Sequence, residues 1–253
     1  MTSATKSRPR ALRPLAAAAL SAAALFGPQA AGFASAAPDP AATPGSACAD
    51  VEVVFARGTF EAPGVGDTGQ AFVNALNSRV PGQTVNVYGV NYPASLDFQD
   101  AIQGVADASN EIQSTAANCP NTAIVLGGYS QGAAVAGFTT SDSVPAGVIL
   151  PAGLSGPMPP AIADHVAAVV LFGLPDSWFL NLVDHSAPPI AIGPLYAPKT
   201  LQLCNPGDPV CSPGGLDRAA HSAYKNNGAA DQAAAFVANA LSTTASARQD
   251  NAA

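Results

Sequence analysis

Short apolar runs recur along the chain after Cys48, and most of them are rich in β-branched residues. They are continuously apolar or nearly so, as expected of strands that are buried on both faces of a parallel sheet. On this basis we predict five strands, at residues 51–56, 84–90, 122–126, 166–172 and 200–203.

Stretches with helical periodicity lie between these runs. Phe72, Leu76 and Val80 fall on one stripe of residues 70–80, and residues 97–117 carry apolar residues with acidic and amide residues between them. Further helices are predicted at residues 131–139 and 231–241. Strands that alternate with helices of this length predict right-handed βαβ units, and therefore a single α/β domain with a mostly parallel sheet.

Two stretches rich in Pro and Gly, residues 141–164 and 175–198, interrupt this alternation. We expect both at the edge of the sheet where open α/β folds bind ligands, and we expect them to form the rim of a substrate groove. Their large apolar residues either line this groove or cover the core: Leu150, Leu154, Met158, Trp178, Phe179, Leu180, Leu182 and Ile190.

Residues 1–36 have the organisation of a secretory signal peptide. Cationic residues precede a short apolar run at 15–26, and Ala34-Ser35-Ala36 fits a cleavage site. The run is too short and too rich in alanine to cross a hydrocarbon core of ~30 Å, so no transmembrane anchor is expected. The protein is therefore predicted to be secreted, and to be extracellular or associated with the cell wall.

The remaining chain divides by composition into three parts. Residues 37–47 are rich in Pro, Ala and Gly without apolar periodicity, which predicts a flexible linker. The folded domain is predicted at residues 48–242, followed by a disordered tail at 243–253. A composition of 48% hydrophobic and 11% charged residues excludes general disorder.

Removal of the signal peptide makes the chain more acidic. The whole chain has a formal charge of −7 from 10 Lys and Arg and 17 Asp and Glu. Four of the cationic residues and none of the acidic ones lie in residues 1–36, so the rest carries −11. This charge argues against nucleic acid and anionic membranes as partners, and it is compatible with neutral lipids, polyesters or glycosidic material.

The chain has four cysteines: Cys48, Cys119, Cys204 and Cys211. An even count in an exported chain predicts two disulfides, for which four cysteines allow three connectivities. Cys204 and Cys211 are close enough in sequence to close a small loop, which leaves Cys48 to pair with Cys119. No metal site is expected, because the cysteine spacing fits no common zinc pattern.

A buried strand leads into the sequence Gly128-Tyr129-Ser130-Gln131-Gly132, which is followed by a helix start rich in small residues. In a G-x-S-x-G elbow the turn is so tight that the serine has a strained backbone, and side chains at the two glycines would collide with neighbouring elements. The helix N-terminus also favours an oxyanion beside the serine. Ser130 is therefore predicted to be a nucleophile.

A serine nucleophile needs a base and an acid, which follow it in the order acid, histidine in α/β-hydrolase-like chains. His221 lies just before the last helix, and Asp208 lies inside the loop between the last two cysteines, where a disulfide would hold it rigidly. We therefore predict Asp208 and His221 as acid and base. His185 and Asp217 are the rival base and acid, and His165 is interpreted as a surface residue or cap.

An oxyanion hole needs two donors. The backbone N–H of Gln131, directly after the nucleophile, is the first. The second is expected in the loop after the first core strand, where Thr59 offers both its N–H and its hydroxyl. Arg57 is interpreted as structural, pairing with a carboxylate or with carbonyls of this loop.

Together these motifs resemble the cutinase family, most closely the cutinase-like proteins of mycobacteria and related actinobacteria. The match runs from Cys48 to about Leu241 and consists of Cys48-Ala49-Asp50, Val54-Phe55-Ala56-Arg57-Gly58-Thr59, Val90-Asn91-Tyr92-Pro93-Ala94, Gly128-Tyr129-Ser130-Gln131-Gly132 and Cys204-Asn205-Pro206-Gly207-Asp208-Pro209-Val210-Cys211, followed by His221.

The resemblance implies a three-layer α/β/α sandwich around five parallel strands, with two disulfides in the pairing given above. It implies a triad of Ser130, Asp208 and His221, an oxyanion hole at Thr59 and Gln131, and a serine without a large lid. The family often has serine at the position of Thr59.

The function implied is that of a secreted serine carboxylic-ester hydrolase, working through an acyl-enzyme on Ser130. Its substrates would be short- to medium-chain fatty-acyl esters, lipids or polyesters. No metal or organic cofactor and a monomeric state are expected. The alternatives are an acetylxylan-esterase-like deacetylase and a catalytically weak secreted protein that binds lipid.

Overall fold

The computed structural model describes residues 48–250, except for the side chains of residues 245 and 247–250. The predicted signal peptide and linker lie outside these residues. The strands are β1 (Val51–Ala56), β2 (Val85–Gly89), β3 (Ala123–Tyr129), β4 (Val166–Phe172) and β5 (Thr200–Leu203). The α-helices are α1 (Gly66–Arg79), α2 (Ala101–Asn118), α3 (Gln131–Thr139), α4 (Ser177–Val183), α5 (Arg218–Ser222) and α6 (Ala229–Asp250). Short 3₁₀ helices are η1 (Phe98–Asp100), η2 (Pro160–His165), η3 (Ala197–Lys199) and η4 (Ala223–Lys225).

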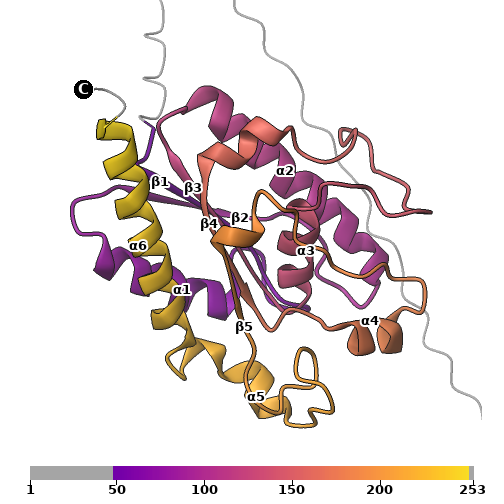
Figure 1. The fold of residues 1–253 in the computed structure, drawn as a ribbon. Coiled ribbons are helices and arrows are strands. Elements are labelled where there is room, and N and C mark those ends of the chain that lie inside the picture. The colour runs from indigo at the N-terminus through magenta and orange to yellow at the C-terminus, as the bar shows by residue number, and fades with distance from the viewer. Residues whose placement is uncertain (1–47, 251–253) are drawn as a thin grey trace, which may run out of the picture. The chain divides into compact units, whose positions relative to one another are not determined.

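The five strands form one parallel sheet in the order β2-β1-β3-β4-β5. Helices α1 and α6 cover one face of the sheet, and α2 and α3 cover the other (Figure 1). The parallel sheet is the one that the alternation of apolar runs and helical stretches predicts, and the three-layer α/β/α sandwich is the one that the resemblance implies.

The two cores follow from the alternation of side chains along each strand. Phe55 and Phe172 point toward α1 and α6, and Phe72 of α1 packs between them, with all three ring centroids 6.2 Å apart. Alternate residues such as Val54 and Leu171 point toward α2 and α3. The central strands β1, β3 and β4 are buried on both faces, as predicted. The edge strands β2 and β5 are only partly buried, so the prediction of burial on both faces is wrong for them.

Both disulfides have the pairing that the sequence predicts. Cys48 and Cys119 join the start of β1 to the end of α2, and Cys204 and Cys211 close the loop after β5. None of the helices within residues 48–250 has the length and apolarity needed to cross a bilayer.

The structure differs from the predicted elements in three places. Helix α4 lies within residues 175–198, for which an irregular segment is predicted, because the side chain of Asp176 accepts a hydrogen bond from the Phe179 N–H (2.7 Å) and starts one short helix. A second short helix, α5, carries His221. Helix α6 continues to Asp250, where the sequence predicts a tail from residue 243, and its alanine-rich composition favours that extension.

Candidate active site

Ser130 lies between the end of β3 and the start of α3, in a backbone conformation that side chains rarely adopt. Its φ is +55° and its ψ is −120°. The Ser130 N–H donates a hydrogen bond to the Phe172 carbonyl at the end of β4 (2.8 Å), which fixes the turn to the neighbouring strand. This strain places the hydroxyl at the carboxyl edge of the sheet.

The two glycines of the elbow are required by close contacts. A Cβ atom on Gly128 would collide with the Gly132 carbonyl group, and one on Gly132 would collide with the Ala56 carbonyl oxygen. The first contact is with α3 and the second with β1. The glycines therefore allow α3 to start close enough to the sheet for the turn to form, as the motif predicts.

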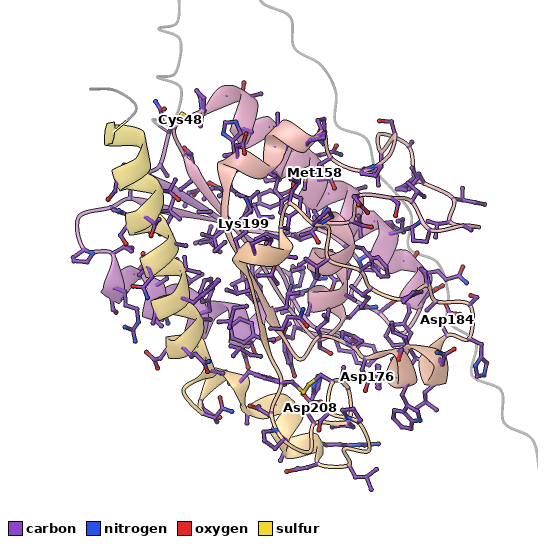
Figure 2. All side chains as sticks on the ribbon, in the orientation of Figure 1. Cys48, Met158, Asp176, Asp184, Lys199 and Asp208 are labelled. Atoms are coloured by element: carbon purple, nitrogen blue, oxygen red, sulfur yellow. A yellow bond between two sulfur atoms is a disulfide. The ribbon has the colours of Figure 1, made fainter. Side chains whose placement is uncertain are left out.

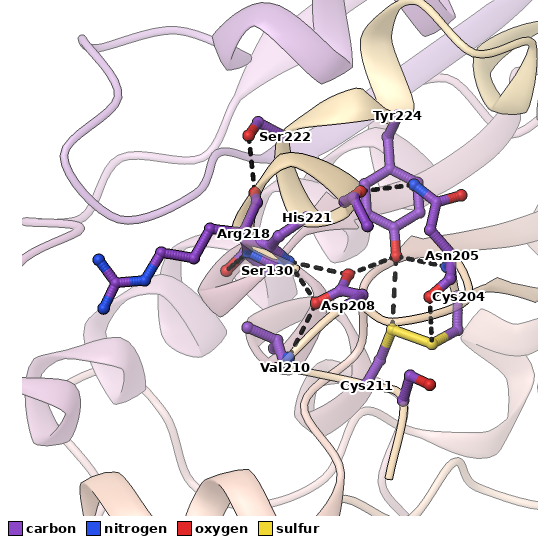
Figure 3. A network of polar contacts seen from close by, with 12 residues as sticks. Ser130, Cys204, Asn205, Asp208, Val210, Cys211, Arg218, His221, Ser222 and Tyr224 are labelled. Atoms are coloured by element: carbon purple, nitrogen blue, oxygen red, sulfur yellow. Dashed lines mark hydrogen bonds and ion pairs between the residues drawn. A yellow bond between two sulfur atoms is a disulfide. The ribbon is translucent and has the colours of Figure 1, made fainter. Parts of the chain in front are cut away.

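Ser130, His221 and Asp208 form a hydrogen-bonded row (Figure 3). The Nε2 atom of His221 is 2.9 Å from Ser130 Oγ, and its Nδ1 atom is 2.9 Å from each carboxylate oxygen of Asp208. The His221 side chain is 19% exposed and that of Asp208 is fully buried. The structure thus brings together the three residues predicted as nucleophile, base and acid.

Asp208 is charged although it is buried, because donors surround it. Burial alone raises the pKa of Asp208, but hydrogen bonds from His221, from the Tyr224 hydroxyl (2.6 Å) and from the Val210 N–H (2.8 Å) outweigh burial and leave the pKa below its ordinary value. A buried carboxylate held this way can stabilise an imidazolium beside it.

The rival residues lie elsewhere. The Asp217 carboxylate caps α5 by accepting a hydrogen bond from the Ala219 N–H (2.9 Å). His185 is exposed, and the neighbouring Asp184 accepts hydrogen bonds from Ser186. His165 ends η2 at the amino end of β4, which is the end away from Ser130.

The backbone N–H groups of Thr59 and Gln131 are both free to bind an oxyanion, since neither donates a hydrogen bond to any described residue. The Thr59 hydroxyl lies 3.4 Å from Gln131 Oε1, and Gln131 Nε2 donates to the Ser95 carbonyl (3.0 Å). The Gln131 side chain therefore links the loop after β1 to the loop after β2.

Arg57 fixes the same loop from behind. Its buried guanidinium donates hydrogen bonds to the carbonyls of Glu61 (2.9 Å), Val90 (3.2 Å) and Tyr92 (2.6 Å). From the sequence, Arg57 is expected to pair with a carboxylate or with carbonyls, and in the structure it pairs with carbonyls.

Comparison with known proteins places the chain in a family. The family model described as Cutinase matches residues 47–241. The chain belongs to the cutinase family. It is 54% identical over 170 residues to "Probable carboxylesterase Culp5" of Mycobacterium tuberculosis, which covers 67% of this chain and 95% of the relative. It is 47% identical over 201 residues to "Phospholipase Culp4" of the same organism, covering 79% of this chain and 83% of the relative.

Solved structures agree with this assignment. Trichoderma reesei cutinase in complex with a phosphonate inhibitor is 35% identical, with a TM-score of 0.57 and a coverage of 77% of each chain. An acetylxylan esterase is 25% identical, with a TM-score of 0.59 and coverages of 77% of this chain and 99% of that structure. This cutinase-family chain is a serine carboxylic-ester hydrolase.

The groove prediction is only partly right for this cutinase-family protein. Met158 and Leu154 belong to the core that α2 and α3 cover, because residues 141–164 start at the end of α3 remote from Ser130. Figure 2 accordingly shows Met158 and Asp208 far apart. Leu180 is also buried, whereas Trp178 and Leu182 on α4 are 53% and 62% exposed after the carboxyl end of β4.

Sequence reasoning missed two residues that contact the predicted triad. Tyr129 of the elbow donates its hydroxyl proton to the His221 carbonyl (2.8 Å), and its ring lies 5.1 Å from the imidazole. Tyr224 contacts Asp208, as described above. No helical pattern marked Tyr224 in the sequence, because neither α5 nor η4 is predicted there. Among the described residues, no group of three or more His, Cys, Asp or Glu side chains is placed to hold a metal ion.

Proposed function

We propose that this chain hydrolyses carboxylic esters through an acyl-enzyme on Ser130, with His221 as general base and Asp208 as the acid that orients it. The observation that carries the proposal is the pair of 2.9 Å contacts of His221, one from Nε2 to Ser130 Oγ and one from Nδ1 to Asp208. This is the geometry in which one imidazole can accept the serine proton and be stabilised while it is charged.

The reaction has two halves. Ser130 Oγ attacks the ester carbonyl carbon while His221 Nε2 takes the hydroxyl proton, and the N–H groups of Thr59 and Gln131 bind the tetrahedral oxyanion. The C–O bond to the alcohol breaks, and the alcohol leaves with the proton from His221. Water then attacks the acyl-enzyme as His221 takes its proton, and collapse returns that proton to Ser130 and releases the acid.

Exposed apolar side chains favour short- to medium-chain fatty-acyl esters as the substrate class. They lie on the loops and the short helix that follow the carboxyl ends of four strands, around the edge that presents Ser130: Phe60, Leu96, Trp178, Leu182 and Leu216. An acyl chain can bury its surface against such residues, at roughly 0.8 kcal/mol for each CH₂ group. The names of the mycobacterial relatives, "Carboxylesterase Culp1" among them, fit this class.

Hydrolysis of p-nitrophenyl esters of increasing acyl length tests the proposal. Wild type is expected to be active with a maximum between butyryl and decanoyl esters, and Ser130→Ala is expected to lose activity by about 10⁶-fold. Equal inactivity of both proteins on every ester would contradict the enzyme assignment and favour a lipid-binding role. A clear preference for the acetyl ester would favour the deacetylase alternative, which the acetylxylan esterase fold also permits.

Arg218 favours phospholipids as a second substrate class. Its exposed side chain makes no hydrogen bond or ion pair with any described residue, whereas other cationic side chains are engaged: Arg57, Arg79, Lys199 and Lys225. Arg218 starts α5, three residues before His221, and extends away from the Asp208–Tyr224 contacts (Figure 3). A guanidinium there can pair with the phosphate of a bound headgroup.

Matched lipids with the same acyl chains test this second class. Arg218→Gln is expected to lower kcat/KM for a phosphatidylcholine by about 10-fold, from the loss of one charged hydrogen bond, and to leave a triacylglycerol unchanged. Arg79→Gln, which removes a cation that is paired with Asp231, serves as the control. Equal losses on both lipids would exclude a headgroup role for Arg218.

Export is the third part of the proposal. Residues 1–36 carry the features of a signal peptide, and two disulfides within residues 48–250 suit an oxidising compartment. We expect a monomer outside the cytoplasm or at the cell wall. Fractionation of a producing cell, with N-terminal sequencing of the product, should show cleavage after Ala36. Retention of residues 1–36 on the isolated protein would contradict export by this route.

A further inference from the structure

Tyr224 is a buried residue that contacts the acid of the triad. It lies in η4, directly after the short helix that carries His221, and it is 0% exposed. Its hydroxyl oxygen is 2.6 Å from Asp208 Oδ2, 3.0 Å from the Asn205 nitrogen and 3.4 Å from Cys211 Sγ. A buried hydroxyl group with three polar neighbours belongs to a polar network and does more than fill space.

The direction of each hydrogen bond follows from the chemistry of the partners. A tyrosine hydroxyl has one proton, and the Asp208 carboxylate can only accept, so that proton points to Oδ2. The Asn205 N–H then donates to the hydroxyl oxygen. Cys211 has no thiol proton, because its sulfur is in the disulfide with Cys204. The row therefore runs from Asn205 N–H to Tyr224 hydroxyl to Asp208.

The hydrogen bond from Tyr224 completes the set of donors around the Asp208 carboxylate. The Val210 N–H serves Oδ1, the Tyr224 hydroxyl serves Oδ2, and His221 Nδ1 is 2.9 Å from both oxygens. Without Tyr224, the donors from Val210 and His221 would remain, but Oδ2 would lose the only donor that it does not share with Oδ1, and the carboxylate plane would be less restrained. The orientation of the imidazole depends on that plane.

We propose that Tyr224 is a positioning residue for ester hydrolysis, whose hydroxyl holds Asp208 in the orientation in which it supports His221 as the proton acceptor. The proposal rests on the function assigned above to the triad. The Tyr224 ring is itself fixed, since it packs edge-on against Tyr129, Phe172 and His221 at centroid distances of 5.9, 6.1 and 6.4 Å. A fixed ring gives the hydroxyl a fixed position.

Tyr224→Phe tests the proposal, because it keeps the packed ring and removes only the hydroxyl. We expect kcat on a p-nitrophenyl ester to fall by about 10-fold, the size of one hydrogen bond to a charged group, with KM unchanged. Tyr196→Phe is the matched control. Tyr196 is also buried, its hydroxyl has no hydrogen-bond partner among the described residues, and this variant should keep the wild-type kcat.

The pH profile separates positioning from a purely structural role. Without the Tyr224 hydroxyl, the Asp208 carboxylate loses one hydrogen bond that stabilises its negative charge. The carboxylate then attracts a protonated His221 more strongly, so the acidic limb of the kcat/KM profile should move to higher pH. Apart from Tyr224 itself, the titratable groups in contact with the imidazole, Asp208 and Tyr129, are unchanged in this variant. A wild-type kcat and an unmoved limb in folded Tyr224→Phe would overturn the proposal.

A second variant decides the matter if Tyr224→Phe does not fold. Incorporation of 3-fluorotyrosine at position 224 keeps the hydroxyl and makes it a stronger donor, so the acidic limb should move to lower pH. An unmoved limb, or a shift to higher pH, contradicts the proposal. Ser130→Ala is measured alongside, because ester hydrolysis that survives it would refute the proposed function itself, whatever Tyr224 does.

Discussion

Asp208 and Asp217 differ in environment although both follow the last strand. Asp208 is fully buried and contacts the imidazole, whereas Asp217 is exposed and caps α5. Asp208 lies inside the loop closed by Cys204 and Cys211, and this loop brings its carboxylate to His221. The role of each carboxylate is thus set by its burial and its donors.

Substitution of each aspartate by asparagine should separate these two roles. Asp208→Asn is expected to lower kcat by about 10⁴-fold, because an amide cannot stabilise the imidazolium and favours the wrong tautomer. Asp217→Asn should change kcat less than 2-fold, since asparagine caps a helix as well as aspartate does. Steady-state kinetics on one ester checks both, and a larger loss for Asp217→Asn would reverse the assignment.

The two disulfides act on different elements. Cys48–Cys119 ties β1 to α2 across a sequence separation of 71 residues, far from Asp208, whereas Cys204–Cys211 spans 7 residues around it. A longer closed loop restricts the unfolded chain more. Stability should therefore depend more on the first disulfide, and catalysis more on the second.

Paired alanine variants are expected to show this division. Loss of Cys48–Cys119 should cost about 4 kcal/mol of unfolding free energy and leave kcat near that of wild type. Loss of Cys204–Cys211 should cost about 2 kcal/mol and lower kcat at least 10-fold, because Asp208 loses its support. Denaturant unfolding and kinetics of both variants give the comparison, and equal kcat values would show that the small loop holds Asp208 without its disulfide.

Glu52 is a buried charge at the contact between β1 and α2. Burial raises the pKa of Glu52, the hydrogen bond from Asn86 Nδ2 (2.7 Å) opposes this, and the charge of Glu111 on α2 adds to it. Its Oε1 atom is buried without a hydrogen-bond partner among the described residues. The ionised carboxyl therefore destabilises the fold at neutral pH.

Glu52→Gln should stabilise the protein in a pH-dependent way. A carboxyl whose pKa is raised on folding costs stability above its folded pKa, and this cost disappears below its ordinary value near 4.5. The variant should thus melt about 2–4 °C higher at pH 7 and no higher than wild type at pH 4. Thermal unfolding followed by circular dichroism at both pH values is the measurement. An equal gain at both would attribute the effect to packing.

Several elements could be predicted from local sequence, and several contacts could not. The elbow was predictable, because the collisions at Gly128 and Gly132 involve adjacent elements and leave a five-residue pattern. Helix α4 could not be predicted, because it is short, lies in a segment rich in proline and is started by a single capping residue, Asp176. The burial of Glu52 was not predicted, because Glu52 lies within an apolar run and the pattern of the run does not show whether a charged residue in it is buried.

At the scale of the whole molecule, charge and apolar surface act on different partners. After residue 36 the chain carries −11, while exposed apolar side chains surround the edge that presents Ser130. The apolar residues favour contact with a lipid aggregate, and the net charge opposes contact with an anionic one. The sign of this charge could be predicted from the sequence, but the position of residues such as Trp178 depends on the fold.

Hydrolysis of lipid emulsions should therefore depend on their surface charge. Adding an anionic amphiphile to a neutral triacylglycerol emulsion is expected to lower the rate several-fold at about 0.01 M salt, where the Debye length is roughly 30 Å. Raising the salt to about 0.15 M should restore most of the rate. A rate that is insensitive to both changes would show that net charge does not govern access to the surface.

The contact between Ser130 and His221 spans 91 residues of sequence, and this has a consequence for the order of synthesis. A ribosome completes the elbow long before it reaches Asp208 and His221. A nascent chain that stops before them has a nucleophile without a base, and its long-range contacts cannot form until the later strands are made. With the triad proposed above, hydrolytic activity can therefore arise only after synthesis has passed His221, so a ribosome-bound chain that has not reached this residue is not an active esterase.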